Sequence, residues 1–263
     1  MSASDPSDVR TSLGRNLTYG LLDVLGRMIV TGAYDGRPFP IEAELSKEHG
    51  VSRSVTREAV KMLGAKGLLT ARPRQGTIIT PPTSWNWFDT DVLRWLLERK
   101  FSLALLRQFT ELRLTIEPGA AALAAQYGDA DGLALIQDGY ARMEAAEAGH
   151  DDPLISDIAF HVAILEASGN PFYAQFRDVV ATALQTSIQF TNRYRGRNAS
   201  LPGHRAIVDS IIARDPEGAA QAMRALIADV MSLIREATAR QNAGQALVEA
   251  SIEQAESQTR GMV

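Results

Sequence analysis

The sequence of 263 residues contains no cysteine. Disulfide bonds, thiolate metal sites, cysteine nucleophiles and iron–sulfur clusters are therefore excluded, and the composition suits a reducing compartment. Aromatic residues are also few, at 6% of the chain, whereas 45% of the residues are hydrophobic and 22% are charged. These last proportions are typical of an ordinary globular protein.

Long apolar runs are missing as well. The longest nearly apolar stretch, residues 225–234, is interrupted by Asp229 and is too short to span a bilayer. The first eight residues lack the apolar segment of a signal peptide. From these absences we expect a soluble, cytoplasmic protein with no membrane partner.

The two ends of the chain differ in charge. Residues 1–83 carry 11 Lys and Arg against 8 Asp and Glu, whereas residues 84–263 carry 16 against 23. Between Val51 and Gly76 there are six basic residues and one acidic residue. An acidic body repels a polyanion, so any contact with nucleic acid has to be made by this basic segment.

The N-terminal third has the order of a winged helix-turn-helix. Apolar spacing predicts helices over residues 17–30, 41–48 and 53–66, the last one capped by Ser52. Short apolar runs at residues 68–71 and 77–80 predict a hairpin. Three helices followed by a hairpin make up this fold.

The rest of the chain predicts helices alone. Pro81 and Pro82 mark a linker. Helical spacing then recurs at residues 89–98, 103–126, 131–148, 153–168, 171–193, 201–214 and 216–240. We therefore expect a mainly α protein with a C-terminal all-α antiparallel bundle of about seven helices. The expected divisions are a DNA-binding domain at 1–82, a Trp-rich linker and first helix at 83–100, an effector-binding domain at 101–242 and a frayed tail at 243–263.

The third helix is the candidate DNA reader, because the first turn of such a helix reaches base edges in the major groove. Arg53 and Arg57 lie four residues apart and share a face, and both can donate two hydrogen bonds to guanine. Lys61 and Lys66 suit phosphate contacts. The other candidate contacts are Ser52, Ser54 and Thr56 in this turn and Arg72, Arg74 and Gly76 at the hairpin tip. The alternative is a solvated basic helix that never contacts DNA.

Several motifs here resemble the DNA-binding domain of the GntR family of bacterial regulators. They are Glu42-x-Glu-Leu-Ser46, Gly50-Val-Ser-Arg-Ser-Val-Thr-Arg-Glu-Ala-Val60, Gly67-Leu-Leu and Arg74-Gln-Gly-Thr77. The resemblance covers about residues 15–82 and implies DNA contacts at Arg53, at Arg57 and around Gln75 and Gly76. Ala43 departs from it, because many members carry a DNA-contacting arginine at that position.

A second group of candidate residues lies in the helical part. Asp157 and His161 are one helical turn apart among apolar residues, and His204 begins another amphipathic helix. A buried carboxylate and imidazole need a partner, which is each other, a metal or a polar ligand. This set suits Zn²⁺, Ni²⁺ or Mn²⁺ with open positions for a chelating ligand. A satisfied core Asp–His pair is the alternative.

Two further polar residues are candidate effector contacts. Arg113 lies among apolar residues and suits bidentate binding of a carboxylate, although a salt bridge to Glu111 or Glu117 is an equal alternative. Gln185 has the chemistry to bind a polyol, or it is a polar residue at a helix boundary. Arg193, Arg195 and Arg197 form a short basic run that suits a solvated loop, and the alternative is that one of them caps the pocket.

The helical part resembles the ligand-binding (FCD) domain of the FadR-type branch of the same family, over about residues 89–240. The motifs are Glu111-Leu-Arg-Leu-Thr-Ile-Glu-Pro118, Ala121-x-Leu-Ala-Ala125, Asp157-x-x-Phe-His161, Ala167-Ser-Gly-Asn170 and His204-Arg-Ala-Ile207. In that branch an Asp and three His bind a divalent metal beneath the effector. The first three map to Asp157, His161 and His204, but the fourth falls at Leu226. The resemblance thus implies either a three-ligand metal site or a metal-free polar pocket.

The linker Trp85-Asn-Trp-Phe-Asp-Thr-Asp-Val-Leu-Arg-Trp95 is similar to that of regulators of sugar-acid catabolism, the galactonate-operon repressors in particular. This resemblance implies an aldonate or related hydroxy acid as effector, with Gln185 as a contact. The aromatic residues of the linker would clamp the DNA reader against the bundle, and ordinary interdomain packing is the alternative.

The sequence as a whole predicts a dimeric repressor that reads a palindromic operator and responds to a small carboxylate, not an enzyme. The rival interpretation is a helical metal-dependent enzyme that acts on a hydroxy acid through Asp157, His161 and His204. A general base or nucleophile at a telling spacing is not evident. A protein-binding scaffold is a third interpretation, and it leaves the polar pocket residues unexplained.

Overall fold

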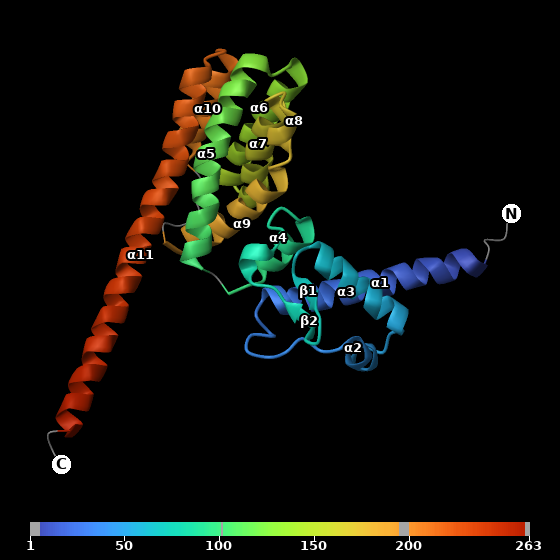
Figure 1. The fold of residues 1–263 in the computed structure, drawn as a ribbon. Coiled ribbons are helices and arrows are strands. Elements are labelled where there is room, and N and C mark those ends of the chain that lie inside the picture. Colours follow the sequence, from blue (N-terminus) through green and yellow to red (C-terminus); the bar gives the residue numbers. More distant parts are fainter. Residues whose placement is uncertain (1–5, 101, 195–199, 261–263) are drawn as a thin grey trace. The chain divides into compact units, whose positions relative to one another are not determined.

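The computed structural model describes residues 6–100, 102–194 and 200–260, and the side chains of 16–100, 102–187 and 200–243. The chain divides into two compact units, residues 1–100 and 101–263. In Figure 1 the first unit runs from blue to green and the second from green to red. Each unit is described by itself below.

The first unit is a winged helix-turn-helix followed by one more helix. Its elements are α1 (Pro6–Val30), α2 (Glu42–Glu48), α3 (Arg53–Ala65), β1 (Leu69–Arg72), β2 (Gly76–Ile79), a 3₁₀ turn η1 (Pro82–Ser84) and α4 (Thr90–Leu97). The predicted order of three helices and a hairpin is confirmed. Helix α1 packs on α3, where Leu25, Ala59 and Leu63 are fully buried.

The hairpin forms the wing. Strands β1 and β2 pair antiparallel, with Leu69 opposite Ile79 and Arg72 opposite Gly76. The turn between them places Gly76 at φ +78°, a backbone conformation that favours glycine. A Cβ atom at Gly76 would meet nothing within 4 Å, so its backbone stands open to an approaching molecule.

The Trp-rich segment packs inside the first unit. Trp95 on α4 is fully buried, and its indole N–H donates to Asp23 on α1 at 2.8 Å. Gly26 makes room for this ring, because a Cβ there would lie 2.1 Å from Trp95. Trp85 is also buried and donates to the carbonyl of Thr80 at 3.1 Å. These two rings anchor residues 85–97 to the DNA-reading unit.

The second unit is an all-α bundle, as predicted. Its elements are α5 (Leu103–Tyr127), α6 (Ala130–Glu147), α7 (Pro153–Ala167), α8 (Pro171–Ala174), α9 (Arg177–Tyr194), α10 (Leu201–Ile212) and α11 (Pro216–Arg260). Figure 1 shows α11 running alongside α5 and continuing past its start. None of the described helices is both long and apolar enough to cross a membrane.

The core of the bundle lies between α5, α6, α7, α9, α10 and α11. Phe160 on α7 is fully buried, and Gly139 on α6 allows the two helices to approach closely, since a Cβ there would lie 2.8 Å from Phe160. Arg214 closes one end, donating from Nη1 to the carbonyls of Ala125 and Gly128. These carbonyls at the end of α5 would otherwise lack intrahelical partners.

Three helix boundaries differ from the sequence-based expectation. Helix α1 begins at Pro6, well before the expected residue 17. The helix expected over 171–193 is interrupted after Ala174, and the break lets both Tyr173 and Phe176 pack on the core. The tail expected to fray from residue 243 is instead helical as far as Arg260. Its Ala, Glu and Gln residues favour helix, and no proline interrupts them.

Candidate functional site

The predicted DNA-reading surface is exposed on the first unit. Ser52 caps α3 by accepting from the backbone N–H of Val55 at 3.3 Å, and its hydroxyl lies 2.9 Å from that of Ser54. The other exposed candidates are Arg53 and Arg57 on α3 and Arg72, Arg74, Gln75 and Gly76 on the wing. The recognition helix and the wing thus both offer their candidate residues to solvent.

Arg57 has a partner on the neighbouring helix. Its Nε lies 3.5 Å from a carboxylate oxygen of Glu42 at the start of α2, and the side chains of Arg57 and Glu42 are 64% and 39% exposed. An exposed pair of this kind contributes little to stability. The guanidinium therefore remains available to a stronger anionic partner.

Thr56, a predicted DNA contact, is instead fully buried. Its hydroxyl lies 2.8 Å from that of Ser46 on α2 and donates to the carbonyl of Ser52 at 3.3 Å. The prediction was wrong because Thr56 belongs to the inner face of α3. Its role is to hold α3 against α2.

Lys66, expected to meet phosphate, is also engaged inside the unit. Its ammonium lies 2.8 Å from carboxylate oxygens of both Asp89 and Asp91, and only 13% of its side chain is exposed. Burial alone would lower the pKa of Lys66, but the two carboxylates raise it above its usual value. Lys66 therefore ties the end of α3 to the start of α4. Lys61 stays largely exposed beside Glu58, so the phosphate prediction remains open for that residue.

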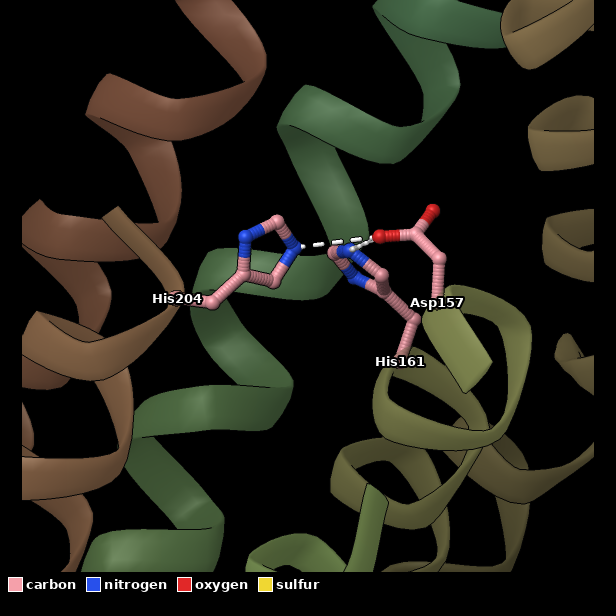
Figure 2. A group of neighbouring side chains, drawn as sticks. All are labelled: Asp157, His161 and His204. Carbon is pink, nitrogen blue, oxygen red and sulfur yellow. Dashed lines mark ion pairs between the residues drawn. The ribbon is translucent and has the colours of Figure 1, made fainter. Parts of the chain in front are cut away.

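Asp157, His161 and His204 converge inside the bundle. Figure 2 shows His204 from α10 facing Asp157 and His161 from α7. Oδ1 of Asp157 lies 3.1 Å from Nε2 of His204 and 3.9 Å from Nε2 of His161. All three residues are buried, and one ligand atom from each lies within 4.8 Å of the others. Phe160 packs edge-on against both imidazole rings.

Hydrogen bonds set the protonation pattern of His204. A carbonyl oxygen can only accept, so Nδ1 of His204 carries the hydrogen of its 2.8 Å bond to the Ser200 carbonyl. In a neutral ring Nε2 then bears a lone pair. This buried Nε2 has no hydrogen-bond partner among the described residues, although Asp157 is 3.1 Å away. The lone pairs of Nε2 of His204 and Oδ1 of Asp157 repel each other, so a positive charge between these two atoms would be stabilising.

Glu117 is the site residue that the sequence analysis missed as a functional group. It is 1% exposed on α5, and its Oε2 lies 2.5 Å from Nδ1 of His161. Arg113, one turn earlier, donates from Nε to Oε1 at 2.5 Å. Arg113 is therefore in the ion pair that was the alternative to carboxylate binding. The i,i+4 spacing of Arg113 and Glu117 among apolar residues was the available signal.

The carboxylates of this cluster are held in the ionised form. Burial alone would raise the pKa of Glu117, but Arg113 and His161 outweigh it and bring that pKa to about 2. Burial likewise opposes ionisation of Asp157, and the neighbouring His204, His161 and Arg113 lower its pKa below the usual range. With neutral imidazoles, one guanidinium and two carboxylates leave one excess negative charge in the core.

The donor set fits a divalent cation. Nitrogen and oxygen ligands sit about 2.0–2.2 Å from Zn²⁺, so ligand atoms around one ion lie roughly 3–3.5 Å apart. The separations of 3.1 and 3.9 Å are of this order. Leu226 packs on the core with Cδ1 3.0 Å from where a Cβ of Gly203 would lie, next to His204. Leu226, the position at which the resemblance predicted a fourth ligand, thus carries an apolar side chain that packs on the core.

The other predicted contacts are less informative. Gln185 is half-buried on α9, and no described contact joins it to the three ligand residues. The side chains of Arg193, Arg195 and Arg197 lie outside the described residues. His150 is exposed and does not belong to the buried group that contains His161 and His204.

Each of the two units matches a known protein family model. The family model described as "Bacterial regulatory proteins, gntR family" matches residues 21–79, and the "FCD domain" model matches residues 108–229. The chain is also 33% identical over 228 residues to the galactonate operon transcriptional repressor of Escherichia coli (strain K12), which covers 85% of the chain and 99% of that protein. The chain belongs to the GntR family, in the branch with an FCD domain.

Two further proteins are similar to this GntR-family chain over most of its length. The uncharacterized HTH-type transcriptional regulator YieP of Escherichia coli (strain K12) is 36% identical over 216 residues, which is 81% of the chain and 93% of that protein. The solved structure of Listeria monocytogenes Lar shares the fold, with a TM-score of 0.55 at 17% identity over 81% of the chain and 96% of that protein. The chain is thus a transcription regulator, and the rival interpretation as an enzyme is not supported.

Proposed function

We propose that this regulator is a dimeric repressor whose release from a palindromic operator is controlled by a sugar acid bound in the helical bundle. The observation that carries the proposal is the buried group of Asp157, His161 and His204, with a histidine nitrogen that lacks a hydrogen-bond partner among the described residues. The similarity to the galactonate operon repressor supports galactonate or a related aldonate as the effector.

Charge supports a monocarboxylate. The described cluster carries one excess negative charge when its histidines are neutral, so a divalent cation would change the balance to one excess positive charge. A single carboxylate would then neutralise the buried group, and uncompensated buried charge is costly. The hydroxyl groups of an aldonate would fill coordination positions that the protein leaves open. A second edge of the Arg113 guanidinium and the amide of Gln185 are the proposed further contacts.

At the other end, Arg53 and Arg57 are the proposed base readers. Ser52 and Ser54 on α3 and Arg72, Arg74, Gln75 and Gly76 on the wing are the proposed supporting contacts. Two recognition helices related by a two-fold axis match a palindromic site. The effector relieves repression only by as much as its affinity differs between the free and the DNA-bound conformations. The site of action is the cytoplasm, where the DNA lies.

The test is a thermal-shift screen against galactonate, other aldonates, and fatty and aromatic acids, each with Zn²⁺, with Ni²⁺ and with EDTA. A ligand at 100 times its dissociation constant adds about 2.7 kcal/mol of stability, which is readily measured. We expect one aldonate to raise the melting temperature, His204→Ala to abolish the rise and the exposed His150→Ala to preserve it.

The same aldonate should release the protein from a duplex obtained by in vitro selection. Stabilisation by fatty or aromatic acids alone would overturn the sugar-acid assignment and leave the DNA reader intact. An unchanged shift in EDTA would remove the cation from the proposal.

A further inference from the structure

Glu117 belongs to the buried polar group without being one of the three candidate ligands. It lies on α5, 1% exposed, between Arg113 on the same helix and His161 on α7, 44 residues later in the chain. Arg113 reaches both oxygens of Glu117, since its Nη2 also donates to Oε2 at 3.4 Å, whereas His161 contacts Oε2 alone. Arg113 donates to Oε1 from Nε at 2.5 Å, and Nδ1 of His161 lies 2.5 Å from Oε2.

The bond from His161 fixes which ring nitrogen is free. An ionised carboxylate only accepts hydrogen bonds, so Nδ1 carries the hydrogen and Nε2 bears the lone pair. That Nε2 faces Asp157, 3.9 Å from its Oδ1. The bond also holds the plane of the ring, because Glu117 is itself held by Arg113.

The two histidines of the cluster differ in this respect. His204 donates to the neutral carbonyl of Ser200, whereas His161 donates to a carboxylate. A carboxylate behind an imidazole makes its other nitrogen more basic and thus a better metal ligand. Arg113 balances the carboxylate charge, which lets the group stay ionised in the core.

We infer that Glu117 is a positioning residue for a divalent cation, which acts by orienting His161 and strengthening its Nε2 as a ligand, with Arg113 holding Glu117 in place. The inference rests on the proposed function, because it takes Asp157, His161 and His204 as the cation site. It also gives Arg113 a role that is independent of the effector.

The test is the affinity of the full chain for Ni²⁺ and for Zn²⁺, measured by competition with a chelator and without any sugar acid. Glu117→Gln keeps the size of the side chain and removes its charge. We expect the dissociation constant to rise about 10- to 100-fold, the usual effect of losing such a partner. Glu111→Gln is the matched control, since Glu111 is half-exposed on the same helix beside Arg107, and it should leave the affinity unchanged.

A double variant guards against misfolding. Arg113→Met with Glu117→Met removes both members of the buried pair and leaves neither charge unpaired. We expect the same loss of affinity. A second readout is the ¹⁵N NMR spectrum of the His161 ring in metal-free protein, which should show a protonated Nδ1 in the wild type and a shift of the proton toward Nε2 in the double variant. A purely structural role would not move this proton.

The outcomes separate the two proposals. Wild-type protein that binds neither metal would overturn both the cation site and the role of Glu117. Tight binding by the wild type with an affinity within about twofold in folded Glu117→Gln would overturn the positioning role alone. An unchanged His161 spectrum in the double variant would do the same.

Discussion

Residues that are adjacent on one helix can have opposite environments, one exposed to solvent and the next buried in the core. On α3, Arg53 and Arg57 are exposed, whereas Thr56 is fully buried and bonded to Ser46. On α5, Arg113 and Glu117 are buried together, and both act within the core. The chemistry of a side chain therefore has to be considered together with the face of the helix that carries it.

The first prediction concerns Arg53. Replacing it with alanine removes two hydrogen-bond donors from the first turn of the recognition helix. We expect a loss of about 1–3 kcal/mol in operator binding and a relaxed base preference at one position. Fluorescence anisotropy with matched and mismatched duplexes measures both effects. Arg99→Ala, an exposed change after α4, is the control. Normal operator binding by Arg53→Ala would mean that another element reads the bases.

Between elements, the first unit depends on the contact of α1 with α4. Gly26 and Trp95 make this contact, and Asp23 accepts the indole hydrogen. Lys66 adds a second tie between α3 and α4 through Asp89 and Asp91. Residues 83–100, which resemble a linker in the sequence, are therefore part of the folded reader.

A pair of glycine substitutions on α1 tests this packing. Gly26→Ala would place a Cβ 2.1 Å from the Trp95 ring. We expect it to destabilise the first unit by about 1–3 kcal/mol, as overpacking does. Gly20→Ala on the same helix meets nothing within 4 Å and should stabilise by about 0.5–1 kcal/mol. Urea unfolding monitored by tryptophan fluorescence distinguishes them. Equal effects of the two changes would contradict the described contact.

The Lys66 ion pairs predict a pH dependence. Burial opposes ionisation of Asp91, but Lys66 and Arg94 lower its pKa below the usual value. The stabilisation it contributes is present above about pH 4 and is lost as the pH falls through the lowered pKa. The pKa of Lys66 is raised, so its contribution is present below about pH 10 and is lost as the pH rises through the raised pKa.

Lys66→Met should therefore lower the thermal stability most between these limits and reduce the changes at the acidic and alkaline ends. Lys61→Met, a change of the exposed neighbour on α3, is the control and should keep the wild-type pH profile. A Lys66→Met profile parallel to that of the wild type at all pH values would show that the ion pairs contribute nothing.

The fold was predictable from the sequence where signals are local. The Ser52 cap, the glycine in the wing turn and the proline at the start of α7 each fix a boundary through their own backbone chemistry. The break between α8 and α9 was not predictable, because it follows from the packing of Tyr173 and Phe176 on distant helices. Packing of this kind leaves no periodic signal.

The candidate site, too, was predictable from the sequence only where its contacts are local. Asp157 and His161 could be paired from spacing alone, since one helical turn separates them. The bond between Glu117 and His161 spans 44 residues and two helices, so no spacing rule indicates it. Thr56 and Lys66 were misjudged because a hydroxyl and an amine look equally suited to DNA wherever they lie on a helix.

At the scale of the whole molecule, charge is the property that separates the two ends of the chain. The basic residues of segment 51–76 are followed by a bundle with excess acid, and the chain as a whole carries a net charge of −4. Binding to a polyanion must therefore be made by a few contacts from the basic segment, because the net negative charge of the protein opposes it.

Salt dependence tests this division. We expect the logarithm of the operator association constant to fall by about 0.9 for each phosphate contacted, per tenfold rise in salt. Arg74→Ala at the wing should reduce that slope by about one contact. Arg205→Ala on α10 lies in the other unit, where it pairs with Asp209, and should leave the slope unchanged. An affinity independent of salt would be incompatible with groove binding.

The meeting of α5, α7 and α10 at one buried polar group has a consequence for motion within the bundle. Each helix brings one part, Glu117, the Asp157–His161 pair and His204 respectively, and these parts are far apart along the chain. A bound cation would therefore act as a cross-link between segments that otherwise open independently. In its absence, amide hydrogens of α10 should exchange faster than those of α5, because Nε2 of His204 makes no hydrogen bond to the described part of the group.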